Sequence, residues 1–196
     1  MNKKMIITIS RTFGSGGHDI GEKLAKKLEI PFYDKNLLKM MSDKTGISEE
    51  GLENADEKLL YQYTDSYSIA FGQDYSTNIY LYKVQKKLIH ELAEKSSCVI
   101  VGRLADWILR ENPDLLRVFV MAPEEFRVSR IMEQEKITEK QAEKLIRQMD
   151  KLRRNYYSFF TDGKWDDMEN KDIIINSSLR GIDGTVEILK SIVNSL

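Results

Sequence analysis

The feature that most constrains the fold is the segment Met5–Leu28, MIITISRTFGSGGHDIGEKLAKKL. It begins with a short apolar run rich in β-branched residues, which favours a buried strand. A glycine-rich turn follows, and Ile20, Leu24 and Leu28 then recur at helical spacing. In this order, the turn brings backbone N–H groups and the positive end of a helix to one point, where they can bind an anion.

The turn itself supplies the candidate binding residues. Glycine permits close backbone approach and positive φ angles, and a neighbouring hydroxyl or imidazole can add a hydrogen bond. An ordinary turn is the alternative, but the position between a strand and a helix favours anion binding. The residues that we expect to contribute are Ser10, Gly14, Ser15, Gly16, Gly17, His18 and Asp19.

The rest of the chain alternates between apolar runs and helical patterns. Strands are expected at Cys98–Val101, Leu116–Met121 and Ile173–Ile175, in addition to Met5–Ile9. Continuous apolar strands that alternate with helices predict an α/β fold with a parallel sheet covered on both faces. The expected helices are Gly17–Leu28, Ser76–Ser96, Pro123–Gln134, Thr138–Tyr157 and Asp183–Ser195, with a capping box formed by Thr138 and Gln141.

The composition is that of one ordinary globular domain. The chain has 196 residues, of which 31% are charged and 41% hydrophobic, and a net charge of −1. Such a chain is not drawn as a whole to nucleic acid or to an anionic membrane, and no apolar run approaches the roughly 18–20 residues of a membrane span. The single cysteine, Cys98, is expected to be a buried thiol in a cytoplasmic protein. A homo-oligomer is compatible with the sequence.

Several arginines can supply positive charge near the turn. Arg103 directly follows the expected strand Cys98–Val101, so it lies at the carboxyl edge of the sheet, where ligands bind in open α/β folds. Asp106 would either orient Arg103 or contact the ligand, and a surface arginine is the alternative for Arg103. Guanidinium groups suit phosphate oxygens, and Asp150 is expected to hold one of the remaining set, which comprises Arg127, Arg130, Arg147, Arg153 and Arg154.

Two stretches interrupt the alternation of strands and helices. Residues 36–73 end in a polar and aromatic run, and residues 134–165 are helical, basic and aromatic. Each stretch either covers a ligand or forms a solvated helical hairpin. The aromatic side chains of the first stretch either stack on a base or pack within the protein, and these are Tyr61, Tyr63, Tyr67, Phe71 and Tyr75.

The order of these features resembles that of the nucleoside monophosphate kinases, and most closely their divergent cytidylate kinase-like family. The resemblance spans nearly the whole chain. The segments that carry it are ISRTFGSGGHDIG, PFYDKNLL, VIVGRLADWIL, RRNYYSFFTDGKW and INSSLRGIDG.

The resemblance implies a P-loop NTPase fold with three α/β/α layers, a helical monophosphate-binding insert and a helical lid. The implied single domain has its core at residues 1–35, 76–133 and 166–196, the insert at 36–75 and the lid at 134–165. The implied reaction is transfer of the γ-phosphoryl group of ATP, with Mg²⁺, to a nucleoside monophosphate, typically CMP or dCMP. Asp34 would begin the monophosphate site, and Arg103 would hold the acceptor phosphate. Arg127 and Arg130 would lead into the lid, which would contribute Arg147, Arg153 and Arg154.

The chain departs from the family pattern at the phosphate-binding turn. Gly17 stands at the position of the usual lysine, and His18 stands at that of the metal-binding serine or threonine. Arg11 occupies the position of the first glycine and could reach across to replace the lysine. Three hypotheses follow: a nucleotide kinase, a nucleotide- or phosphate-binding protein that lost the chemistry, or a kinase for another small acceptor.

Overall fold

The computed structural model describes residues 4–34, 36–52 and 73–196, and for residues 73–78 it describes the backbone alone. Much of the expected insert therefore lies outside the described residues. This includes the aromatic residues Tyr61, Tyr63, Tyr67 and Phe71, together with the side chain of Tyr75. Their base-stacking or packing role stays a prediction.

The centre of the molecule is a five-stranded sheet in which all neighbouring strands run parallel. Its spatial order is β2-β3-β1-β4-β5, and the predicted parallel α/β class is confirmed. The strand β2 was not predicted, because two residues are too few to carry a periodic pattern. The strands are β1 (Ile6–Arg11), β2 (Phe32–Tyr33), β3 (Cys98–Val101), β4 (Leu115–Met121) and β5 (Ile173–Asn176).

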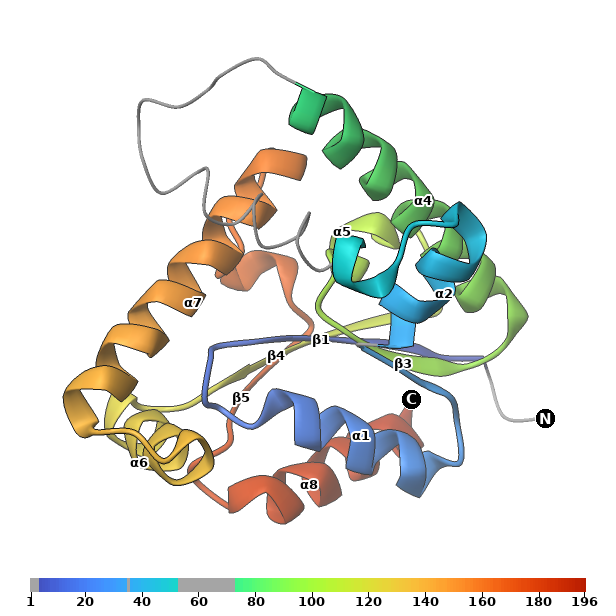
Figure 1. The fold of residues 1–196 in the computed structure, drawn as a ribbon. Coiled ribbons are helices and arrows are strands. Elements are labelled where there is room, and N and C mark those ends of the chain that lie inside the picture. Colours follow the sequence, from blue (N-terminus) through green and yellow to red (C-terminus); the bar gives the residue numbers. More distant parts are fainter. Residues whose placement is uncertain (1–3, 35, 53–72) are drawn as a thin grey trace.

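One face of the sheet is covered by α1 (Gly17–Leu28) and α8 (Gly181–Ser195), which lie together below the strands in Figure 1. Successive side chains of a strand point to opposite faces. Ile7 and Ile9 of β1 therefore pack toward these two helices, in a cluster that includes Leu24. This packing places the amino end of α1 at the carboxyl end of β1.

The opposite face carries α2 (Asn36–Thr45), α4 (Gln73–Lys95) and the short α5 (Ala105–Ile108) (Figure 1). Ile6 of β1 and Cys98 of β3 belong to the core on this side. The thiol of Cys98 is fully buried, as predicted, and burial raises its pKa to about 11. The two helical layers and the sheet between them form the predicted three-layer arrangement.

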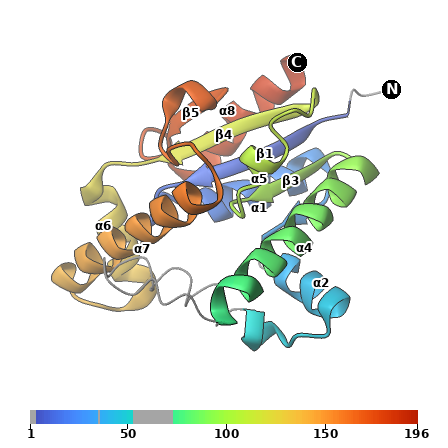
Figure 2. The ribbon, with the colours of Figure 1, turned by 90° about the horizontal axis from the view of Figure 1, so that it is seen from above.

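Two further helices stand beside the carboxyl edge of the sheet, where β1 and β4 end (Figure 2). They are α6 (Glu124–Glu135) and α7 (Glu139–Phe160), and a small apolar cluster of their own joins them. The predicted capping box is present, since Gln141 Oε1 accepts a hydrogen bond from the Thr138 N–H at 2.9 Å. The division of the chain into core, insert and lid stays a prediction.

A short 3₁₀ helix, η1 (Met168–Asn170), follows α7 and precedes β5. Among the residues that the structure describes, no helix combines the length and the apolar character that crossing a membrane requires.

Candidate functional site

The glycine-rich turn between β1 and α1 adopts a conformation that two of its glycines require. Gly14 has a φ of 81° and Gly16 a φ of 80°, both in the left-handed region that favours glycine. A Cβ atom at Gly16 would also collide with the Ile182 side chain at the start of α8. Glycine is therefore required at both positions by the backbone conformation, and at Gly16 also by close packing against Ile182.

Two serine hydroxyls fasten this turn to the rest of the protein. The Ser15 hydroxyl is buried and donates to the carbonyl oxygens of Thr12, at 2.8 Å, and Val120, at 3.1 Å. The Ser177 hydroxyl, just beyond β5, donates to the Ser15 carbonyl oxygen at 2.6 Å. Ser15 was expected to offer its hydroxyl to a ligand. In the structure that hydroxyl instead holds the turn to the end of β4.

Arg11 lies in the space that larger residues at two other positions would need. A Cβ atom at Gly17 would stand 2.5 Å from Arg11 Cβ and 2.8 Å from its Cγ. A Cβ atom at Gly102 would collide with Arg11 Nη1. The Arg11 side chain therefore runs from the end of β1 past the start of α1 and over the turn that follows β3.

A second arginine joins Arg11 from α7. Arg153 Nη1 donates to the Arg11 carbonyl oxygen at 2.9 Å, and its guanidinium lies 5.4 Å from the centre of the Phe13 ring. Burial and, next, the charge of Arg11 lower the pKa of Arg153 to about 9, so it stays positively charged at neutral pH. Burial also lowers the pKa of Arg11, which the charge of Asp34 partly offsets. Two cations are thus crowded together in a partly desolvated place, a pattern that is common at functional sites.

Asp150 connects these elements, as predicted for a carboxylate among the arginines. Its Oδ1 accepts the Phe13 N–H at 2.7 Å, and its Oδ2 lies 2.7 Å from Arg127 Nη1. Arg127 also donates to the Phe13 carbonyl oxygen at 3.2 Å. Asp150 is also 3.7 Å from Arg153. Both helices of the α6–α7 pair are therefore attached to the turn through one carboxylate.

The start of α1 carries two further charged pairs. Arg130 of α6 pairs with Asp19 at 2.5 Å. His18 Nδ1 lies 2.5 Å from the carboxylate of Asp34, which follows β2. The imidazole that replaces the usual hydroxyl is therefore in contact with an acidic residue of the expected monophosphate side.

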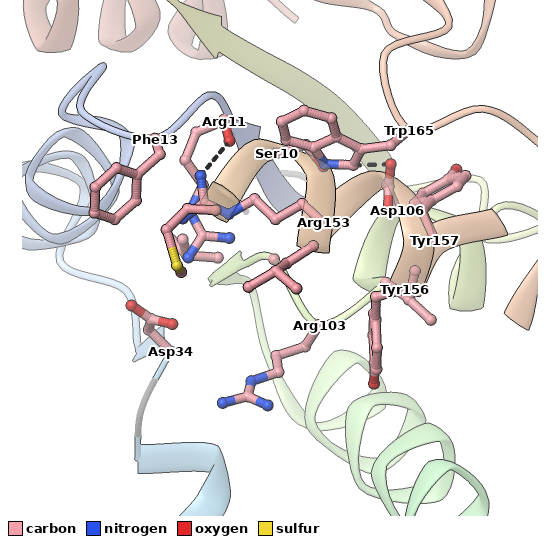
Figure 3. Close-up of a pocket in the computed structure, with 15 residues that line it drawn as sticks. Ser10, Arg11, Phe13, Asp34, Arg103, Asp106, Arg153, Tyr156, Tyr157 and Trp165 are labelled. Carbon is pink, nitrogen blue, oxygen red and sulfur yellow. Dashed lines mark hydrogen bonds between the residues drawn. The ribbon is translucent and has the colours of Figure 1, made fainter. Parts of the chain in front are cut away.

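Two cavities adjoin these residues. One, of about 300 Å³, lies over the turn and is lined by Gly14, Gly16, Gly17, His18 and Arg130. The other, of about 420 Å³, is bordered by the residues in Figure 3, among them Arg103, Tyr156 and Trp165. Arg11, Phe13, Asp34 and Arg153 line both cavities. Figure 3 shows Arg11 and Arg153 near Phe13, with Asp34 and Arg103 around the same space.

Arg103 is held on an unusual turn at the edge of the second cavity. Gly102, Arg103 and Leu104 have φ angles of 69°, 56° and 56°, so three successive residues are left-handed. Non-glycine residues rarely adopt this conformation, and it persists where the surroundings enforce it. The buried Gln85 of α4 donates to the Arg103 carbonyl oxygen at 2.9 Å and thereby fixes the turn.

Asp106 has a different partner from the one considered in the sequence. Lys171, which precedes β5, lies 2.5 Å from the Asp106 carboxylate, and the Ser10 hydroxyl donates to the same oxygen at 3.4 Å. The side chains of Lys171 and Asp106 are 1% and 5% exposed, so this is a buried ion pair. Asp106 lines the larger cavity, but its charge is directed to Lys171.

Two of the predicted lid arginines lie apart from the site. Arg147 pairs with Glu143 on the exposed side of α7, where 65% of the arginine side chain is accessible. Arg154 pairs with Asp166, and its guanidinium lies 5.8 Å from the Trp165 ring centre. Arg153 is thus the predicted lid arginine that faces both cavities. A helix turns by about 100° per residue, which separates Arg153 from its neighbour Arg154.

Sequence reasoning missed Gln85, Lys171 and Ser177 as parts of the site. A glutamine on an otherwise apolar helix stripe was a usable signal for Gln85, because buried polar groups need partners. Lys171 and Ser177 gave no comparable signal. Their partners, Asp106 and Ser15, are 65 and 162 residues away in the chain.

The parallel sheet, the glycine turn between β1 and α1 and the arginines around it define the fold class of the P-loop kinases. A shikimate kinase from Bacteroides thetaiotaomicron shares this fold, with a TM-score of 0.57, 16% sequence identity and coverage of 98% of this chain and 99% of that one. The Cytidylate kinase-like family matches residues 6–179. The chain therefore belongs to the cytidylate kinase-like family.

Individual proteins agree with this assignment. The chain is 26% identical to the cytidylate kinase of Pyrococcus horikoshii, over 98% of this chain and 90% of that protein. It is 29% identical to the cytidylate kinase of Archaeoglobus fulgidus, over 94% of this chain and 92% of that protein. A crystal structure of an uncharacterized protein from Eubacterium ventriosum matches with a TM-score of 0.74 and 31% identity, over 98% of this chain and 100% of that one.

Proposed function

We propose that this protein transfers the γ-phosphoryl group of ATP to a nucleoside monophosphate, with CMP or dCMP as the preferred acceptor. The observation that carries this proposal is the shared wall of the two cavities. Arg11 and Arg153 line both the cavity over the glycine turn and the cavity beside Arg103. A phosphoryl group that passes between two bound phosphates needs cations at the boundary, because its catalysis is chiefly positioning and charge stabilisation.

The residues divide into two binding parts. On the ATP side, the turn offers backbone N–H groups and the amino end of α1, with Arg130 and His18 at its rim. On the acceptor side, Arg103 would bind the monophosphate, and Asp34 stands between both parts. Arg127 acts as a positioning residue, because it contacts the Phe13 carbonyl and Asp150. The assignment of Arg147 and Arg154 to catalysis would require a rearrangement of their present ion pairs.

Mg²⁺ is the metal that the proposed reaction uses. It prefers oxygen ligands and often rests on one or two carboxylates together with substrate phosphates. Thr12 and Asp34 line the cavity over the turn, and the buried Thr12 hydroxyl has no hydrogen-bond partner among the described residues. These two oxygen donors fit the ion, and Thr12 and Asp34 would hold it in the cavity over the turn, where its charge would offset that of bound phosphates. Asp34 is also the residue that His18 contacts, so His18 would orient this carboxylate.

The family and the relatives support the proposal independently of the cavities. Proteins that match over 90% or more of their own length carry the name cytidylate kinase. The choice of CMP or dCMP as acceptor rests on those names. The proposal of phosphoryl transfer rests on the two cations, Arg11 and Arg153, that line both cavities.

A nucleotide-binding protein without turnover is the second candidate. It is favoured by Gly17 and His18, which replace the lysine and the hydroxyl of the usual turn. A kinase for another small acceptor is the third, since Tyr156, Tyr157 and Trp165 give the larger cavity an aromatic wall that many ring-shaped molecules would fit.

One assay separates the three functions. The protein is incubated with ATP, Mg²⁺ and each of CMP, dCMP, UMP, AMP and GMP, and ADP formation is followed. We expect ADP formation that depends on CMP or dCMP. ATP binding by calorimetry without turnover on any acceptor would support the second function, and turnover only with a non-nucleotide acceptor would support the third.

A further inference from the structure

We propose that Arg11 supplies the phosphate-binding cation from the end of β1, and that position 17 must be glycine to make room for the Arg11 side chain. We call this pair an exchange, because the usual turn has glycine at position 11 and lysine at position 17. This inference rests on the proposed function and explains how the altered turn carries it out. The residue at position 17 would then be a positioning residue for Arg11. Arg11, six residues earlier in the chain, would supply the positive charge that the lysine supplies in the usual turn.

A side chain at position 17 would collide with the Cβ and Cγ atoms of residue 11. A Cβ atom at position 17 would meet Arg11 Cβ at 2.5 Å and Cγ at 2.8 Å, and its next neighbour is Val120 Cβ at 3.5 Å. The first two distances are shorter than non-bonded carbon atoms tolerate, whereas the third is ordinary van der Waals contact. Replacement of Arg11 by glycine, which removes both Cβ and Cγ, would therefore leave enough space for alanine at position 17, whereas alanine at position 11 would keep the Cβ contact at 2.5 Å.

The backbone gives no other reason for glycine at position 17. The positive-φ glycines of the described chain are Gly14, Gly16, Gly46, Gly102 and Gly181, and Gly17 is not one of them. Gly17 is the first residue of α1, and glycine is disfavoured in helices relative to alanine. A glycine that neither φ nor helix propensity requires is explained by what occupies the space beside it.

The path of Arg11 leads its charge to the site. The guanidinium lies over Gly102, so that any side chain there would collide with it, and the residue lines both cavities. Arg153 contacts the Arg11 carbonyl, and Asp34 is close enough to influence the Arg11 guanidinium. A lysine at position 17 would instead extend from the start of α1. The two geometries exclude each other, because the stem of Arg11 fills the position of the lysine Cβ.

A double-mutant cycle tests this coupling directly. Four proteins are compared: the unaltered chain, Gly17→Ala, Arg11→Gly and the double variant Arg11→Gly/Gly17→Ala. Calorimetry measures the affinity of each for ATP and for tripolyphosphate without an acceptor, and thermal unfolding is followed in parallel. If the two positions interact, the effect of the double substitution will differ from the sum of the two single effects, and this difference measures the coupling.

We expect Gly17→Ala to weaken ATP and tripolyphosphate binding about tenfold or more in the presence of Arg11, because it displaces the cation. In the Arg11→Gly background, which lacks both clashing carbon atoms, the same change should have less than a twofold effect. Gly163→Ala is the control, since its nearest neighbour would lie at 3.4 Å and its φ is not left-handed. If Gly17→Ala fails to fold while the double variant folds, the steric coupling is likewise supported.

Equal losses from Gly17→Ala in both backgrounds would overturn the proposal, and so would an Arg11→Gly variant that binds both anions normally. A further double variant tests the exchange itself: Arg11→Gly combined with Gly17→Lys should bind tripolyphosphate at least fivefold more tightly than Arg11→Gly alone. These measurements use no acceptor. A chain that shows the coupling but transfers no phosphoryl group would therefore refute the proposed kinase reaction and leave the exchange standing.

Discussion

At the scale of single residues, Gln85 illustrates how a buried amide can determine a binding geometry. Three successive left-handed residues follow β3, and the Gln85 side chain donates to the middle one. The turn costs conformational energy, and this hydrogen bond offsets part of that cost. The position of Arg103 at the larger cavity therefore depends on a residue of α4 that is 18 positions away.

Replacing Gln85 should affect the acceptor more than ATP. We expect Gln85→Leu to raise the KM for CMP about tenfold and leave the KM for ATP within twofold, because the turn that carries Arg103 loses the hydrogen bond from the Gln85 amide. The free energy of unfolding should fall by about 1–3 kcal/mol. Steady-state kinetics with each substrate varied in turn, and urea unfolding, measure the two effects. Lys86→Leu on the exposed side of the same helix is the control. An equal rise in both KM values would remove Gln85 from this role.

At the scale of elements, the α6–α7 pair is joined to the glycine turn through Asp150. One carboxylate contacts the Phe13 N–H and Arg127, and it lies near Arg153. The pair therefore cannot move without changing the contacts of the turn. A motion of these helices would be transmitted to the residues that line both cavities.

Removing the charge of Asp150 should loosen this attachment. Asp150→Asn retains the shape but leaves Arg127 without its buried counter-ion, and breaking such a pair costs about 3–5 kcal/mol. We expect a lower urea midpoint and weaker ATP binding. Glu143→Gln, which removes the partner of the exposed Arg147 on the same helix, should change stability by less than about 1 kcal/mol. Similar stabilities for the two variants would contradict the proposed attachment.

The elements also show which parts of the fold a sequence can reveal. The boundaries of α1 agree with the predicted Gly17–Leu28, because the apolar stripe and the glycine turn mark both ends. The strand β2 has only Phe32 and Tyr33, and it exists because β3 offers it backbone partners. Long-range pairs such as Lys171 with Asp106 leave no trace in local spacing. The glycine turn and the carboxylate of Asp150 among the arginines could thus be predicted, whereas the pairing of Lys171 with Asp106 could not.

At the scale of the whole molecule, the crowded cations link folding to ligand binding. Burial, and next the charge of Arg11, lower the pKa of Arg153 in the folded protein to about 9, well below the ordinary value of an arginine. A cation with a lowered pKa destabilises the fold while it is charged. This destabilisation is fully present below about pH 9 and is relieved as the pH rises from there toward the ordinary pKa of an arginine. A bound polyphosphate would counter it at neutral pH.

Differential scanning calorimetry can measure this link. We expect saturating tripolyphosphate to raise the unfolding temperature of the unaltered chain by several degrees at pH 7, with a smaller rise for Arg153→Met. Without ligand, Arg153→Met should unfold about 2–4 °C higher for each kcal/mol of relieved repulsion and desolvation. A ligand-free Arg153→Met that unfolds at a lower temperature than the unaltered chain would show that Arg153 stabilises the fold despite its burial.

The Ser177 hydroxyl has a consequence for the polarity of the turn. It binds the Ser15 carbonyl oxygen at 2.6 Å, and the chain has no cis peptide bond among its described residues. In a trans peptide, the carbonyl and the following N–H point in opposite directions. The Gly16 amide hydrogen is therefore directed away from Ser177. The Ser177 hydroxyl thus fixes the orientation of the peptide between Ser15 and Gly16. That orientation decides whether an approaching phosphate would meet the amide hydrogen or the carbonyl oxygen.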